Sequence, residues 1–415
     1  MLTRRIFLHR SALAMVGVGA APAWLGRAVY ADAGRGKKIL VAIFQRGAAD
    51  GLNVVVPFTE KRYYEMRPTI AVPQPSSKQA ESALDLDGFF GLHPSLGPLH
   101  KLYQQRQLAI VHAAGSPDPT RSHFDAQDFM ESGTPGVKST RGGWLNRALP
   151  SERGPRSPLR AVAFGQSLPR TMRGPNPAAA IDEIGNFQIR DQKAAGGFES
   201  MYASSVDAVL HGPGRDTFEA VKLLQSIQKQ TYTPAGGASY PRGRLGDSLQ
   251  QIARLIKAEV GVEVAFADIG GWDHHVNEVG LTVSQGPLAN LLRDLGQALA
   301  AFHQDLGDRM GGIAVVTMSE FGRTARENGN RGTDHGHANA MFVMGGGVGG
   351  GKVYGQWPGL ETEQLYQARD LAVTTDYRQV LAELVENHLG NRKLEAVFPG
   401  FAPDPQKLPG LVAST

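Results

Sequence analysis

The 415-residue sequence contains no cysteine. This absence excludes disulfide bonds, thiolate metal sites and a cysteine nucleophile, so the stability of the chain must come from its core. The sequence also lacks any run of five or more Lys and Arg residues, a pattern typical of segments that bind nucleic acid. We therefore expect no nucleic acid among the partners of this protein.

Long hydrophobic runs are missing as well, and the N-terminal apolar segment has the pattern of an export signal instead. Thr3-Arg4-Arg5-Ile6-Phe7-Leu8 is a twin-arginine pattern, and an apolar run from Ser11 to Leu25 follows it. Small residues up to Ala31 predict a signal peptide of residues 1–31. The run contains Gly and Pro and is too short to span roughly 30 Å of hydrocarbon, which disfavours a retained membrane anchor.

The predicted signal peptide implies a route and a destination. Twin-arginine signals direct folded bacterial proteins, often already loaded with a cofactor, through the twin-arginine translocase. We expect a periplasmic or secreted protein without stable membrane insertion. The predicted signal peptide holds four of the 43 basic residues and none of the 39 acidic ones, so the net charge of +4 belongs to it. The rest, residues 32–415, is balanced in charge and long enough for one large domain.

Short apolar runs rich in Val and Ile alternate with helical patterns along this domain. We expect strands at residues 38–44, 108–113, 161–164, 262–267, 313–317 and 341–344. We expect helices at residues 125–131, 217–229, 247–259 (with Asp247 as N-cap), 286–306 and 376–388. This alternation predicts an α/β fold, a three-layer sandwich with a mostly parallel central sheet covered on both faces.

Other stretches do not fit the alternation. Residues 74–89, 150–160 and 169–197 are rich in Pro, Gly, Ser and charge, which predicts long surface loops or a small cap, with excursions around residues 150–245. Residues 345–351 hold six glycines around Val348. Because they lack the lysine and hydroxyl of a phosphate-binding loop, we expect a flexible turn near the site rather than a nucleotide site.

Two Asp/His clusters are the most informative feature of the sequence. Asp273-His274-His275 and Asp334-His335-Gly336-His337 lie in loops bounded by glycine and hold four of the 12 histidines. Asp supplies a hard anionic ligand and neutral His a directional borderline one, so the clusters predict a mixed oxygen and nitrogen metal site. Such a site accepts Zn, Mn, Mg, Ca or Fe, and the sequence does not choose among these divalent cations.

Further polar residues follow the expected strands, where the loops of a parallel sheet build its site. Asp50 lies in a tight loop after the first strand, and Glu320 follows the strand at 313–317. Ser122 precedes the helix expected at 125–131. There it is either the N-cap or a group placed where the helix N-terminus favours an anion.

Five phrases of the sequence resemble the DUF1501 family of exported bacterial proteins. They are Arg46–Leu52, Ser122–Phe124, Gly270–His275, Ser319–Thr324 and Gly332–His337. The resemblance runs across most of the domain. It implies membership of the alkaline phosphatase and sulfatase superfamily, and hence an alkaline phosphatase-like sandwich with two divalent cations around a hydroxyl nucleophile.

The resemblance also implies roles for individual residues. Asp50 resembles a ligand of one metal, and Asp273 with His275 resembles the ligands of the other. The superfamily commonly spaces this second pair as Asp-x-x-x-His, and Asn277 occupies the last place here. A further imidazole would come from His335 or His337.

The completion of the implied site stays open. The strand that ends in Ser319-Glu320 normally precedes an Asp-His pair in the superfamily. Either Glu320 replaces that pair, or Asp334-His335 is the pair, displaced by a loop.

The implied reaction is the hydrolysis of a phosphate or sulfate ester. Ser122 would attack the ester, the cations would spread the developing charge, and water would release the covalent intermediate. An arginine could hold the anion through two hydrogen bonds, and the candidates are Arg46, Arg121 and Arg323. A formylglycine nucleophile is not expected, since it is made from the cysteine that this chain lacks.

Two other hypotheses remain from the sequence. The chain could be a non-catalytic periplasmic binding or assembly protein on a degenerate hydrolase scaffold, with Asn277 and Ser319-Glu320 marking lost chemistry. Alternatively, the clusters could hold loops together around one cation. Fold alone does not decide among these possibilities.

Overall fold

The computed structural model describes residues 38–149, 157–186, 219–408 and 410–413. The predicted signal peptide lies outside these residues. Each of the six predicted strands is present: β1 (Ile39–Gln45), β5 (Leu108–Gly115), β6 (Ala161–Phe164), β8 (Val264–Ile269), β9 (Ile313–Ser319) and β10 (Asn339–Gly345). The apolar runs therefore predicted the main strands correctly, to within two residues at each end.

These strands form a mainly parallel central sheet. Its order is β11-β5-β10-β9-β1-β8-β6-β7, with β12 also paired to β5. The short strands β7 (Ala179–Ile181), β11 (Val353–Tyr354) and β12 (Thr375–Asp376) were not predicted. β10 is antiparallel to both of its neighbours, β5 and β9. Its N-terminal end therefore lies at the same edge as the carboxyl ends of the parallel strands.

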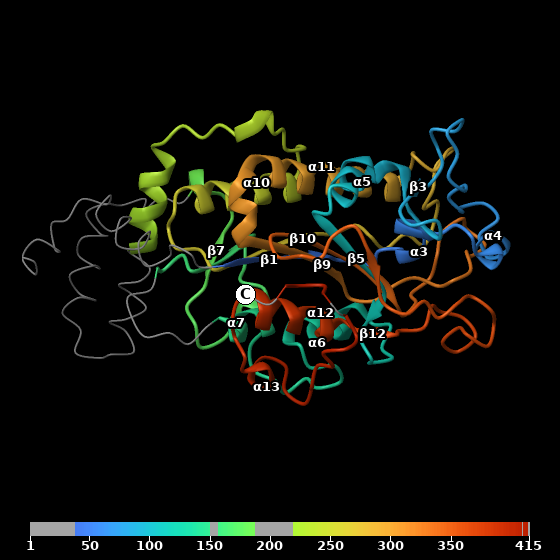
Figure 1. Cartoon of the computed structure of the whole chain (residues 1–415). Helices are drawn as coiled ribbons and strands as arrows, with labels where there is room; N and C mark the ends of the chain where they lie inside the picture. Colours follow the sequence, from blue (N-terminus) through green and yellow to red (C-terminus); the bar gives the residue numbers. More distant parts are fainter. Residues whose placement is uncertain (1–37, 150–156, 187–218, 409, 414–415) are drawn as a thin grey trace, which may run out of the picture.

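Helices cover both faces of the sheet (Figure 1). One face carries α5 (Gly97–Gln104), α10 (Arg244–Lys257) and α11 (Pro287–Leu306), and the other carries α6 (His123–Ser132), α7 (Trp144–Ala148), α12 (Tyr377–Glu383) and α13 (Leu394–Val397). Successive side chains of β1 alternate between the two cores, with Val41 and Ile43 in one and Leu40, Ala42 and Phe44 in the other. Burial on both faces explains the nearly continuous apolar sequence of this strand.

The predicted helices are found with shifted ends. α10 begins at Arg244 after Gly243, so the prediction of Asp247 as its N-cap was wrong. Asp247 lies in the first turn instead, where a carboxylate interacts well with the helix dipole. The helix predicted at 376–388 divides into α12 and the π-helical turn η6 (Leu384–His388). Residues 219–228 are helical, within the predicted 217–229, whose first two residues lie outside the described ones.

Smaller elements occupy the connections. A second sheet contains β2 (Val55–Pro57), β4 (Phe90–Leu92) and β3 (Leu84–Asp85), so the predicted loop 74–89 contributes one strand. Short helices and turns are α3 (Gly51–Val54), α4 (Lys61–Met66), η1 (Pro94–Leu96), η2 (Arg170–Met172), η3 (Ile184–Asn186), η4 (Ala235–Gly237) and η5 (Gly307–Gly312). No helix in the described ranges is long and apolar enough to cross a membrane.

The glycine-rich run does form a turn, but its predicted nearness to the site was wrong. Gly345 pairs with Ala314 at the start of β9, and Gly346 donates to the carbonyl of Met310 at 2.8 Å. β9 is seven residues long, so its two ends lie roughly 20 Å apart. The turn is thus at the opposite edge of the sheet from Glu320.

Candidate metal centre

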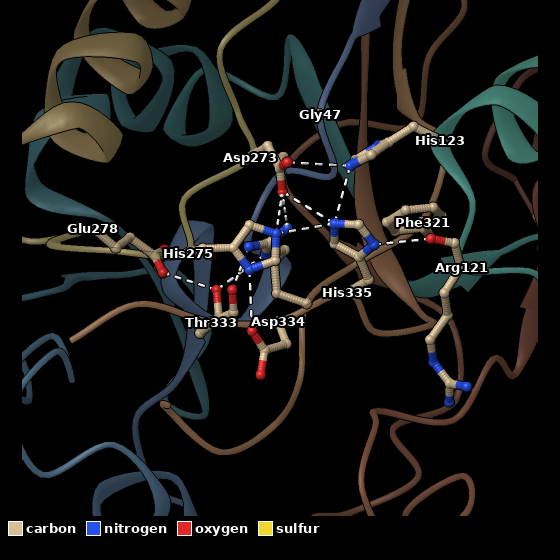
Figure 2. Close-up of polar contacts among 12 residues, drawn as sticks. Gly47, Arg121, His123, Asp273, His275, Glu278, Phe321, Thr333, Asp334 and His335 are labelled. Atoms are coloured by element: carbon tan, nitrogen blue, oxygen red, sulfur yellow. Dashed lines mark hydrogen bonds and ion pairs between the residues drawn. The ribbon is translucent and has the colours of Figure 1, made fainter. Parts of the chain in front are cut away.

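The polar loops lie together at the carboxyl ends of the parallel strands. The loop after β5 leads to His123 at the start of α6, and the loop after β8 carries Asp273 and His275. Because β10 runs in the opposite direction, the loop before it brings His335 to the same place. Figure 2 shows these four side chains turned toward one another.

The ligand-type atoms of these side chains converge. Nε2 of His335 lies 3.0 Å from Nε2 of His123 and 3.1 Å from Nε2 of His275. Asp273 places Oδ1 at 2.9 Å from Nε2 of His275 and 3.2 Å from that of His335, and Oδ2 at 3.4 Å from Nε2 of His123. One atom each from His123, Asp273 and His335 fall within 4.8 Å of one another. His275 joins this trio through its contacts with two of them.

The opposite nitrogen of each ring is held by an acceptor. The Nδ1 atoms of His123, His275 and His335 lie 2.7, 3.0 and 2.8 Å from Oε1 of Glu320, Oδ1 of Asp334 and the carbonyl oxygen of Arg121. Ionised carboxylates and carbonyls only accept, so each Nδ1 carries the hydrogen and Nε2 carries a lone pair in the neutral ring. Lone pairs 3.0 Å apart repel unless a proton or a metal cation lies between them. Such backing of each ring is characteristic of metal ligands.

The spacing fits one divalent cation. A tetrahedral ion with bonds of about 2.0–2.1 Å holds its ligand atoms about 3.3 Å apart. The measured separations run from 2.9 to 3.4 Å. His123, Asp273 and His335 therefore match the donors and the size of a mononuclear site, and His275 lies beside them.

Glu320 stands behind His123 rather than among the converging atoms. Its buried carboxylate accepts at Oε1 from the backbone N–H of Gly47 and from Nε2 of Gln127, each at 2.8 Å. Burial opposes ionisation, but the hydrogen bonds from His123 and Gln127 outweigh it and hold the pKa of Glu320 below its usual value. The hydrogen bond to Glu320 in turn raises the pKa of His123.

Buried packing fixes the rings further. Phe321 lies with its ring centroid 5.0 Å from that of His123 and 5.1 Å from that of His335. Gly47 lets the backbone after β1 approach Asp273 closely, since a Cβ at this position would lie 2.8 Å from the backbone nitrogen of Asp273. Its φ of +119° also disfavours any other residue.

Arg323 orients Asp273. Its buried guanidinium donates from Nη1 to Oδ1 of Asp273 at 2.6 Å, and it also donates to the hydroxyl and carbonyl of Thr333. Burial favours the neutral acid, but the hydrogen bond and charge of Arg323 outweigh it and lower the pKa of Asp273. Arg323, one of the three candidates for holding a substrate anion, is therefore paired with a residue of the cluster.

Asp50, predicted as a metal ligand, lies in a separate buried pair. Arg67 donates to both of its carboxylate oxygens, at 2.5 and 2.9 Å, and both side chains are almost completely buried. Within the described residues Asp50 makes no hydrogen bond or ion pair with the four converging side chains. Its carboxylate is satisfied by Arg67, an ion pair that the sequence did not reveal.

Two other predicted residues also lie apart from the converging atoms. The ring of His337 stacks on Tyr366, with centroids 4.3 Å apart. Ser122 is the N-cap of α6, and its hydroxyl accepts from the N–H of Asp125 at a long 3.5 Å. The N-cap interpretation of Ser122 is thus confirmed, and among the described residues its hydroxyl makes no hydrogen bond with the four converging side chains.

The remaining arginine candidates are paired with carboxylates. Arg121 donates to Oδ2 of Asp370 at 2.6 Å, while its backbone carbonyl holds His335. Arg46 pairs with Asp268 at 2.7 Å and Glu131 at 2.9 Å. Both guanidinium groups therefore already have carboxylate partners within the protein.

His123 was missed as a candidate ligand. It lies inside the phrase Ser122-His123-Phe124 that carried part of the family resemblance, directly after a strand end. A histidine in that loop was the available signal, but only the neighbouring serine was given a role. The structure places the imidazole, and not the hydroxyl, toward Asp273.

Comparisons with known proteins add a family and little else. A family model described as "Protein of unknown function (DUF1501)" matches residues 37–395. No curated protein matches the chain. A solved structure of the C-terminal periplasmic domain of EcEptC from Escherichia coli, in complex with Zn, aligns at 8% identity over 75% of this chain and 74% of that chain. Its TM-score of 0.33 is too low to support an argument about fold or function.

Proposed function

The chain belongs to the DUF1501 family, and we propose that it is an exported, metal-dependent hydrolase of phosphate or sulfate esters with an alkaline phosphatase-like fold. One observation carries the proposal: Nε2 of His335 lies within 3.1 Å of the Nε2 atoms of both His123 and His275, and the carboxylate of Asp273 lies within 3.4 Å of all three rings. A purely structural cluster would not need two imidazole lone pairs to face that of a third ring.

The donor set supports a particular kind of cation. Three imidazoles suit zinc or iron better than magnesium or calcium, which prefer oxygen ligands. When bound, a divalent cation supplies Lewis acidity, which polarises an ester oxygen and favours attack by water or a hydroxyl near neutral pH. Glu320, Asp334 and the carbonyl of Arg121 orient the three imidazole rings by accepting hydrogen bonds from their Nδ1 atoms.

The start of α6 supports binding of an anion. Within the described residues, the backbone N–H groups of His123 and Phe124 have no hydrogen-bond acceptor. These groups lie at the positive end of a ten-residue helix, beside a ligand of the cluster. The helix N-terminus therefore offers the ester oxyanion the donors that the paired arginines do not.

Ser122 is the proposed nucleophile. Its side chain is exposed at the same helix end, and its long cap bond of 3.5 Å leaves the hydroxyl largely unconstrained. Attack by Ser122 would form a covalent phosphate or sulfate ester on its oxygen and release the alcohol. Hydrolysis would then restore the hydroxyl.

The test combines turnover with metal content. The purified mature protein, loaded with zinc, should hydrolyse an aryl phosphate or aryl sulfate, and Asp273→Ala should abolish both turnover and metal retention. Ser122→Ala should abolish turnover while keeping the metal. Activity in Asp273→Ala equal to that of the parent would exclude the proposed site.

A binding protein is the second candidate, and two observations favour it. Asp50 is paired with Arg67, and the three candidate arginines are paired with carboxylates, so these four residues provide neither a second cation site nor an arginine clamp. Under this alternative, Ser122→Ala changes no property of the protein. A phosphate or sulfate adduct on Ser122, found by mass spectrometry, would exclude it.

Export through the twin-arginine translocase belongs to the same proposal. It is motivated by Arg4-Arg5 and the apolar run that follows. Replacing both arginines by lysine should leave the protein in the cytoplasm. Fractionation that finds the variant in the periplasm in normal amounts would rule out this route.

A further inference from the structure

Large apolar side chains are exposed next to the candidate metal ligands. Among the described residues, Phe124 is 90% exposed, Leu281 94%, Val276 55% and Val137 45%. Phe124 directly follows His123, and Val276 directly follows His275. Single exposed apolar residues are common on protein surfaces. An apolar residue directly after two of the four converging side chains is not a scattered pattern.

The two histidines that precede these residues approach the same point from different elements. His123 and His275 both contact Nε2 of His335, at 3.0 and 3.1 Å. Consecutive Cα atoms are about 3.8 Å apart, so the backbone of Phe124 and that of Val276 each lie one residue from a candidate ligand. One stands at the start of α6 and the other in the loop after β8.

Ordered backbone holds both side chains in the solvent. The loop that carries Val276 is fixed by hydrogen bonds from Asn277 to Asn330 and from Glu278 to Arg331, both at 2.9 Å. The start of α6 is fixed by the bond from Ala126 to the carbonyl of Ser122, also at 2.9 Å. The protein thus presents two apolar groups to water beside a polar cluster at a cost in hydration free energy.

We propose that Phe124 and Val276 bind the organic group of the ester substrate, and that this group is apolar, an aryl or alkyl chain rather than a sugar or nucleoside. The inference rests on the proposed hydrolase function and specifies its substrate class. Phe124 and Val276 offer no side-chain hydrogen-bond donor or acceptor, so a polyhydroxylated group would lose water without replacement. The apolar pair would therefore select the organic half of the ester, while the cluster and the helix end take the anion.

The experiment measures binding and turnover separately. The zinc-loaded mature protein is titrated calorimetrically with phenylphosphonate and with methylphosphonate, which carry the same anion and are not hydrolysed. We expect phenylphosphonate to bind roughly tenfold to a hundredfold more tightly, the range for burying one ring against apolar groups. Phe124→Ser should remove most of this preference, and Val276→Ser part of it.

Leu281→Ser is the matched control. Leu281 is as exposed as Phe124 but does not adjoin any of the four converging residues. The Leu281→Ser variant should prefer phenylphosphonate as strongly as the parent does. The zinc content should be unchanged in all three serine variants. An equal loss in Leu281→Ser and Phe124→Ser would overturn the inference.

The outcomes separate the inference from the function. Equal affinity for both phosphonates, with esters still hydrolysed, overturns the apolar substrate and leaves the hydrolase intact. Absence of both binding and turnover in zinc-loaded protein rejects the hydrolase and the inference with it. Self-association of the parent in sedimentation, or binding to phosphatidylcholine vesicles, that Phe124→Ser abolishes would assign the apolar pair to another occupant and overturn the inference.

Discussion

Nε2 of His123 lies 3.0 Å from Nε2 of His335, although both rings donate through Nδ1 to an acceptor on the other side. Two neutral imidazoles in these tautomers repel each other at that distance. A divalent cation removes the repulsion, and a proton shared between the rings removes it less well. The pair therefore marks the position where the cation is expected.

Metal content tests this relationship directly. We expect about one equivalent of divalent metal per chain in the parent, measured by ICP-MS after exposure to zinc. His123→Ala or His335→Ala should reduce the metal content to less than about a tenth of an equivalent, since each substitution removes one ligand. His337→Ala is the control, because its ring stacks on Tyr366. Loss of metal in His337→Ala but not in His123→Ala would contradict this arrangement.

The pH dependence of metal binding should depend on Glu320. The hydrogen bond to Glu320 raises the pKa of His123 above its ordinary value, whereas burial lowers the pKa of His335. In the metal-free protein His123 is thus protonated below its raised pKa, and the cation must displace that proton. Zinc affinity should therefore fall as the pH drops through this raised value.

Glu320→Gln separates the two contributions of this carboxylate. The midpoint of the pH dependence should move to lower pH, because the charge that raises the pKa of His123 is gone. The affinity on the alkaline plateau should fall by about 10–100-fold, because the ring is less firmly oriented. Glu327→Gln, which contacts Thr69 and Ile70, should change neither quantity. A midpoint that stays in place in Glu320→Gln would refute the assignment.

Glu278, next to the buried pair of Asp50 and Arg67, should make the stability of the protein depend on pH. Glu278 is buried and hydrogen-bonded to Asp50; burial and then the charge of Asp50 raise the pKa of Glu278 well above 4.5. A raised pKa in the folded state contributes stability that is fully present below about pH 4.5. That contribution is lost as the pH rises toward the folded-state value.

Glu278→Gln cannot ionise, so it escapes this loss. Its free energy of unfolding, relative to the parent, should increase from pH 5 to pH 9 in urea titrations. The exposed Glu363→Gln should follow the parent at every pH. Asp50→Asn should lower the free energy of unfolding by about 3–5 kcal/mol at neutral pH, because it removes the carboxylate that pairs with the buried Arg67. A pH-independent difference for Glu278→Gln would argue against a protonated Glu278.

Gly47 should be required for the position of Asp273. In Gly47→Ala the added Cβ would meet the backbone nitrogens of Asp273 and Trp272 at 2.8 and 2.9 Å. We expect both a lower melting temperature and at least a tenfold loss of zinc affinity. Gly88→Ala is the control, since Gly88 has a φ of +84° and open space around it. That variant should show only the conformational cost of about 1 kcal/mol and unchanged zinc affinity.

Local patterns in the sequence predicted the main sheet because buried strands require short apolar runs. The runs at 39–45 and 313–319 contain almost no polar residue, and each lies between two cores. Edge strands such as β11 have two residues and no comparable pattern. The helix ends were predicted less accurately than the strands, since Gly243 rather than Asp247 precedes α10.

The candidate site was predictable in part. The Asp/His clusters identified Asp273, His275 and His335, because these residue types are concentrated in two loops. The choice between Glu320 and Asp334 could not be made from spacing. In the structure both carboxylates contact Nδ1 of a histidine, Glu320 that of His123 and Asp334 that of His275.

By itself, the sequence determined which segments become buried strands and which loops hold the hard and borderline ligands, because composition and periodicity are local properties. Only the tertiary structure decided which of those ligands meet. The antiparallel direction of β10 brings His335 to the edge that holds His123 and Asp273. Arg67, far from the clusters in sequence, takes Asp50 into an ion pair instead. Long-range pairing of strands and charges is not encoded in any single segment, since it depends on how the whole core packs.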